Sequence, residues 1–139
     1  MTSTFTPEEL TYLDSQFLGR LATVDASGVP QNNPVGFVVR ADGTIDIGGH
    51  AMGRTRKFRN VDANGHAALV VDDLVSTNPW TVRGIEIRGT AEALEDTDPP
   101  MQGMSREIIR ITPTWIASWG LVEGAPMSIK GRRPGEAAA

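Results

Sequence analysis

The sequence predicts a mainly β protein of the α+β class, built as an antiparallel β-barrel with a few short helices. About six segments have the composition or alternation of strands, and about two or three have the signals of short helices. Short turn sequences separate most successive strands. Tight turns connect antiparallel neighbours, whereas parallel strands need long crossovers, so a parallel α/β sheet is disfavoured.

The first element is a helix within an N-terminal segment of residues 1–17. Thr6 is a suitable N-cap, and Pro7 suits the first turn. Glu9 stands three residues after the cap and completes a capping box. These signals place the helix at about residues 7–16.

Strands follow this helix as far as residue 48. Residues 20–25 alternate in polarity, residues 26–28 form a turn, and residues 29–40 continue as a longer extended run. A second turn at residues 41–43 leads to a strand over residues 44–48.

Another helix is expected over residues 54–62, ended by Asn64 and Gly65. Residues 66–71 read as a buried strand, and residues 72–79 as a polar loop.

The C-terminal part contains two further strands. The strand over residues 80–94 contains Gly84 and Gly89, which indicate bulges or close backbone approach. Residues 106–119 form a last strand kinked at Pro113. A flexible tail is expected over residues 128–139.

Composition limits the class of protein. The 139 residues suit a single domain over residues 1–139, and the absence of cysteine excludes a disulfide scaffold and thiol catalysis. The formal charge of −4 argues against general nucleic-acid binding. No lysine or arginine precedes Arg20, and the longest apolar run, residues 67–71, is far too short to span a membrane. We therefore expect a soluble cytoplasmic protein with neither nucleic-acid nor membrane partners.

Several catalytic classes lack their signatures. With only His50 and His66 and no cysteine, no metal site is expected. No GxSxG, GxxxxGK[ST] or GxGxxG motif follows a strand, which disfavours serine hydrolases, P-loop proteins and Rossmann folds. No side chain stands out as a catalytic acid or base.

The segment from Gly53 to Val61 gathers four of the thirteen basic residues, with no acid between them. Cations in the first turn of a helix oppose its dipole at about 0.3–1 kcal/mol each, unless an anion binds there. A glycine-containing approach, a helix N-terminus and basic side chains together favour a phosphate site. A solvated helix face is the alternative.

The run from Pro30 to Phe37 carries three amides and two prolines inside a strand-like segment. Proline is tolerated only at an edge or a bulge, and buried amides need partners. This strand therefore faces a ligand or a partner chain, or it is a solvent-facing edge.

Several stretches resemble the pyridoxamine 5′-phosphate oxidase-like superfamily: Leu18–Val24 with Gly28–Pro30, Gly53–Val61 and Gly84–Ala91. Two more, Ile109–Pro113 and Ser118–Leu121, resemble its actinobacterial branch that uses the deazaflavin coenzyme F420. The resemblance implies an FMN-binding-like split β-barrel and a homodimer with cofactor sites at the subunit interface. It also implies an F420-dependent oxidoreductase that transfers a hydride between the reduced deazaflavin and a small organic substrate.

The resemblance also implies two groups of cofactor-binding residues. A phosphate-facing group consists of Arg54, Thr55, Arg56, Lys57 and Asn60, and a group lining the ring consists of Asn33, Pro34, Val35 and Gly36. The branch has no fixed catalytic side chain. An FMN-dependent oxidase and a non-catalytic carrier of deazaflavin or tetrapyrrole are the alternatives. Coenzyme F420 is favoured over FMN because the basic segment offers more charge than one phosphate requires.

Overall fold

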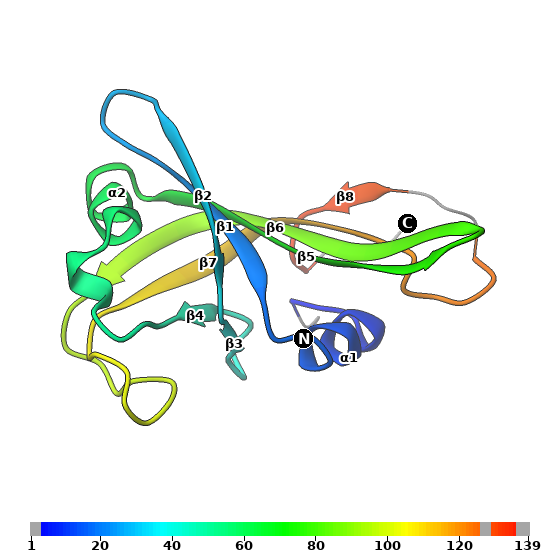
Figure 1. Ribbon diagram of the computed structural model, residues 1–139, viewed down its shortest axis with the longest axis horizontal. Coiled ribbons are helices and arrows are strands. Elements are labelled where there is room, and N and C mark those ends of the chain that lie inside the picture. The colour runs from blue at the N-terminus through cyan, green and yellow to red at the C-terminus, as the bar shows by residue number, and fades with distance from the viewer. Residues whose placement is uncertain (1–3, 126–128, 136–139) are drawn as a thin grey trace.

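An eight-stranded antiparallel sheet forms most of the computed structural model, which describes residues 4–125 and 129–135 (Figure 1). Its strand order is β2-β1-β5-β6-β7-β4-β3, and β8 pairs with β7. The strands are β1 (Gly19–Val24), β2 (Pro30–Val35), β3 (Val38–Val39), β4 (Ile45–Ile47), β5 (His66–Thr77), β6 (Trp80–Leu94), β7 (Ile108–Trp119) and β8 (Lys130–Arg132). The helices are α1 (Pro7–Asp14), the 3-10 turn η1 (Met52–Arg54) and α2 (Arg56–Asn64).

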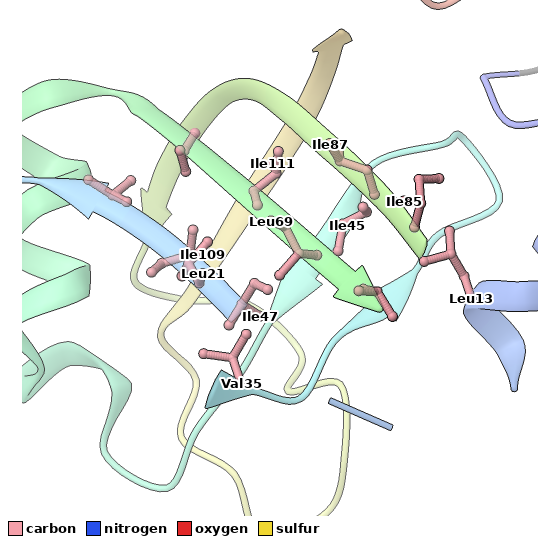
Figure 2. Packing of buried hydrophobic residues seen from close by; sticks show 14 of the residues in the cluster. Leu13, Leu21, Val35, Ile45, Ile47, Leu69, Ile85, Ile87, Ile109 and Ile111 are labelled. Carbon is pink, nitrogen blue, oxygen red and sulfur yellow. The ribbon is translucent and has the colours of Figure 1, made fainter. Parts of the chain in front are cut away.

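The sheet curls around one apolar core, as a barrel requires. Figure 2 shows side chains from β1, β4, β5, β6 and β7 pointing toward one another. The isoleucines of β4, β6 and β7 are fully buried, as are Leu21 of β1 and Leu69 of β5. Leu13 brings α1 into the same cluster. The predicted mainly β barrel with short helices is confirmed.

The extended run predicted over residues 29–40 is two strands instead of one. β2 pairs with β1, whereas β3 pairs with β4 at the opposite end of the strand order. The chain leaves the first pairing after Val35, and only Gly36 and Phe37 connect the two strands. Val35, Phe37, Val38 and Val39 continue an apolar run through this connection, so the composition does not mark the break.

The predicted loop over residues 72–79 is mostly strand. β5 continues to Thr77 and β6 begins at Trp80, so the two strands form a long ribbon that extends away from the barrel (Figure 1). Polar residues are stable there because the ribbon is open to solvent and cross-strand pairs satisfy them. Asp73, for example, lies opposite Arg83 and accepts a hydrogen bond of 2.7 Å from its Nε.

Both glycines predicted on β6 mark crowded positions. The register between β6 and β7 shifts between Arg88 and Gly89, opposite the predicted kink at Pro113. A Cβ atom added to Gly89 would overlap the carbonyl oxygen of Thr112. One added to Gly84 would lie 2.7 Å from a ring carbon of Trp119.

The predicted capping box begins α1. Thr6 Oγ1 accepts a hydrogen bond of 3.1 Å from the Glu9 N–H, and Glu9 Oε1 accepts one of 3.0 Å from the Thr6 N–H. The helix ends at Asp14, two residues before the predicted end at Gln16.

The C-terminal segment holds α1 in place, contrary to the flexible tail predicted over residues 128–139. In the described part of that tail, Arg132 donates hydrogen bonds of 2.6 and 2.8 Å to the two carboxylate oxygens of Glu9. Glu9 is only 1% exposed, and Ser118 on β7 donates a third hydrogen bond to it. A buried carboxylate needs such partners, and this need orders β8. Residues 128 and 136–139 lie outside the described residues.

No helix within the described residues is long and apolar enough to cross a membrane.

Candidate functional site

The basic segment surrounds the start of α2. Thr55 is the N-cap, and its Oγ1 accepts a hydrogen bond of 3.3 Å from the N–H of Phe58. The helix therefore begins at Arg56, two residues later than predicted, and Arg54 belongs to η1. The N–H of Phe58 is taken by this cap, whereas the N–H groups of Arg56 and Lys57 have no acceptor within the helix and are available to an anion.

Among the described residues, the four cations of this segment have no carboxylate partner, and Arg59 donates a hydrogen bond only to the carbonyl oxygen of Arg54. Arginines elsewhere, such as Arg110 and Arg132, form salt bridges with carboxylates. Within the described residues no salt bridge involves Arg54, Arg56, Lys57 or Arg59, and the first turn of α2 contains no acid. Lys57 is half-buried and the three arginines are exposed. Unpaired cations beside the positive end of a helix dipole repel one another until an anion binds, which supports the phosphate site.

Asn60 has a different environment from the basic residues. It is 4% exposed, and its Nδ2 donates a hydrogen bond of 3.0 Å to Thr23 Oγ1 on β1. Phe58 and Val61 are also buried, so this face of α2 packs on the sheet. The side chain of Asn60 thus fastens the helix that carries the cations.

The segment predicted to line the ring ends the edge strand β2. Asn33 is half-buried, Pro34 and Gly36 are exposed, and Val35 joins the core. The edge position explains why two prolines are tolerated. A proline lacks the N–H that a strand inside the sheet would need for pairing, and an edge strand pairs on one side only. Gln31, on the same strand, has a buried Oε1 without a hydrogen-bond donor among the described residues. The atoms that bury this acceptor belong to the chain itself.

Within one chain the two groups of predicted residues are separate. α2 packs on β1 through Asn60, and β1 pairs with β2. No hydrogen bond or salt bridge in the described part of the chain joins the basic segment to residues 33–36. An elongated ligand, with a ring at one end and phosphate at the other, would be needed to contact both.

A cavity of about 660 Å³ lies between α1 and the β3 region, beyond the end of β2. The sequence does not predict this cavity, because its two walls come from segments that are separate in the chain. Leu10, Leu13 and Gln16 come from α1 or the residues just after it, and Phe37 and Val38 follow Gly36 directly. The volume falls within the roughly 300–1,000 Å³ typical of small-molecule sites.

The comparisons with known proteins agree with this architecture. The family model for pyridoxamine 5′-phosphate oxidase matches residues 5–129. This chain belongs to that family. It is also 48% identical over 124 residues to a 5a,11a-dehydrotetracycline/5a,11a-dehydrooxytetracycline reductase of Streptomyces rimosus, with 84% of each protein covered.

Solved structures give the same fold for this family member. An F420 reductase superposes with a TM-score of 0.62 and 25% identity, covering 81% of this chain and 98% of that one. A heme-binding protein from Mycobacterium smegmatis superposes with a TM-score of 0.69 and 14% identity, covering 91% of this chain and 56% of that one. The predicted split β-barrel is therefore confirmed.

Proposed function

We propose that this protein is an F420-dependent reductase that transfers a hydride to a small polycyclic substrate of the dehydrotetracycline type. The observation that carries the proposal is the cluster of unpaired cations at the start of α2 in an otherwise acidic protein. The 48% identical reductase and the F420 reductase of the same fold support both the oxidoreductase and the cofactor.

The residues present fit the deazaflavin. Arg54, Arg56 and Lys57, with the first N–H groups of α2, would hold the phosphodiester, and Arg59 would meet part of the glutamate tail. The strand from Asn33 to Gly36 would line the ring. The chemistry that the bound, reduced cofactor supplies is a hydride for an electron-poor carbon of the substrate, while water supplies a proton to the neighbouring atom. The protein contributes orientation and charge, and no described side chain is needed as a covalent catalyst.

The active form in this proposal is a homodimer with its cofactor sites at the subunit interface. The position of β2 at the edge of the sheet, with one side of its hydrogen-bonding ladder uncovered, supports a second chain against β2. A partner there would also complete the ring site begun by residues 33–36. We place the reaction in the cytoplasm, because a multiply charged cofactor does not cross a bilayer unaided.

The test is to titrate purified protein with coenzyme F420 and with FMN side by side, and then to follow oxidation of reduced F420 on addition of 5a,11a-dehydrotetracycline. We expect tight deazaflavin binding, weaker FMN binding and substrate-dependent oxidation. Tight FMN binding with none for F420 would instead indicate the FMN-dependent oxidase. Binding of F420 or haem without turnover of any substrate would indicate a carrier.

A further inference from the structure

The cavity between α1 and β3 adjoins the strand proposed to line the ring. Phe37 and Val38, which line it, follow Gly36 without a gap. The backbone oxygen of Phe17, just after α1, lies only 4.0 Å from the position that a Cβ of Gly36 would occupy. The end of β2 and the segment after α1 therefore meet at the cavity, and Figure 1 shows α1 close to β3.

Hydride transfer restricts where a substrate can bind. The donor and acceptor carbons must approach to roughly 3–3.5 Å, so the substrate must contact the ring directly. A substrate site must then adjoin residues 33–36. The cavity meets this requirement, whereas the exposed ribbon of β5 and β6 extends away from the barrel.

The cavity is lined by both apolar and polar side chains. Leu10, Leu13, Phe37 and Val38 supply the apolar surface, and Thr11, Asp14 and Arg40 supply polar groups. Burial of ring carbons against such walls stabilises a bound aromatic molecule, and the polar groups satisfy its oxygens.

Arg40 lies between two carboxylates but keeps N–H groups for a further partner. Its Nη1 lies 3.3 Å from Asp46 Oδ2 and its Nε lies 3.9 Å from Asp42 Oδ1. Asp46 already accepts two hydrogen bonds from Arg110. The Arg40 side chain remains 44% exposed, so its other N–H groups can donate to an oxygen of a ligand.

We infer that this cavity is the substrate site, and that it selects a flat, multi-ring molecule whose edge carries hydroxyl and carbonyl oxygens. The inference rests on the proposed function for the position of the ring. Leu10 and Val38 form opposite walls of the site, and Arg40 orients the oxygenated edge.

The test fills the cavity from either wall. Leu10→Trp and Val38→Trp should each raise the KM for 5a,11a-dehydrotetracycline at least ten-fold, while the Kd for coenzyme F420 stays within two-fold of wild type. Glu8→Trp is the matched control, because Glu8 is exposed on the same helix two residues from Leu10 and thus faces another way. It should leave both constants unchanged.

Direct binding of 5a,11a-dehydrotetracycline to cofactor-free protein, followed by its fluorescence, separates this inference from the proposed function. Saturable binding that both cavity variants abolish would support the substrate site even if reduced F420 were never oxidised. Turnover with an unchanged KM in a folded cavity variant would overturn it, as would failure of wild type to bind the compound at all.

Discussion

Lys57 and Arg56 occupy the first two positions of α2, but Lys57 is half-buried whereas Arg56 is exposed. Lys57→Ala and Arg56→Ala should each weaken the binding of coenzyme F420 by about 1.5–3 kcal/mol, the value of a charge-assisted contact. We expect Lys57 to lie at the upper end, because solvent screens its charge less. Fluorescence titration with the deazaflavin measures both effects.

Arg88→Ala is the matched control for these two variants. Arg88 is an exposed arginine on β6 that pairs with Glu86 and lies outside the basic segment, and its removal should leave the cofactor affinity unchanged. Unfolding midpoints should match wild type for Arg56→Ala. Wild-type affinity in either α2 variant would refute the phosphate role of that residue, and raised salt should weaken binding to the wild-type protein.

Gly89 lies at the register shift between β6 and β7. Gly89→Ala should lower the free energy of unfolding by at least about 1–3 kcal/mol. The added Cβ would overlap backbone atoms of Thr112, which cannot move aside. Gly49→Ala is the control, since its Cβ would meet only ordinary contacts, the nearest at 3.7 Å. Urea denaturation compares the two, and equal midpoints would contradict the assigned crowding.

The contact between α1 and β8 is the clearest test at the scale of elements. Arg132→Gln leaves the buried Glu9 carboxylate without its main partner and should lower the free energy of unfolding by about 3–5 kcal/mol. Arg106→Gln removes a salt bridge with Asp96, whose side chain is 85% exposed. This change should alter the free energy of unfolding by less than about 1 kcal/mol. Similar losses for both variants in urea denaturation would contradict a special role for the contact.

Acid should loosen the same contact. Burial raises the pKa of Glu9, but hydrogen bonds from Arg132, the Thr6 N–H and Ser118 outweigh it and hold the pKa below its ordinary value of 4.5. Around and below pH 4.5 the unfolded chain therefore binds more protons than the folded protein. The stabilisation that the ionised Glu9 carboxylate contributes is complete above this pH and is lost as the pH falls through the pKa of Glu9 in the folded protein. Glu9→Gln should make stability less steeply dependent on pH in this range, as measured by denaturation at several pH values. An unchanged slope would show that Glu9 does not titrate differently on folding.

Helix and strand boundaries that depend on neighbouring residues are predictable from the sequence. The capping box at Thr6 and Gly65, which ends α2 in a left-handed conformation, are examples, because each acts within a few residues. The extension of β5 to Thr77 is not predictable in this way, because it depends on pairing with β6. Arg132 was missed for the same reason, since its partner Glu9 is distant in sequence.

The candidate site divides in the same way. The cations from Arg54 to Arg59 were found because they are contiguous and oppose the charge of the whole protein. The cavity is not predictable from the sequence, because Leu10 and Val38 come together only when the chain folds. The role of Asn60 in binding the cofactor stays a prediction. Within the chain, its side chain donates a hydrogen bond to Thr23.

At the scale of the whole molecule, the uncovered β2 edge predicts association. Light scattering at micromolar concentration should give twice the mass of one chain, because a second chain would cover the open hydrogen-bonding edge of β2. A wild-type protein with the mass of one chain would exclude this interface.

The bond between Glu9 and Arg132 joins residues from the two extremes of the described chain. During synthesis on a ribosome, α1 is made well before Arg132, so the Glu9 carboxylate has no guanidinium partner while the intervening strands are added. A nascent chain stalled before residue 132 would still lack this partner. We therefore expect α1 to dock on the barrel more weakly until β8 is added, and the wall that α1 contributes to the cavity to be less firmly fixed until then.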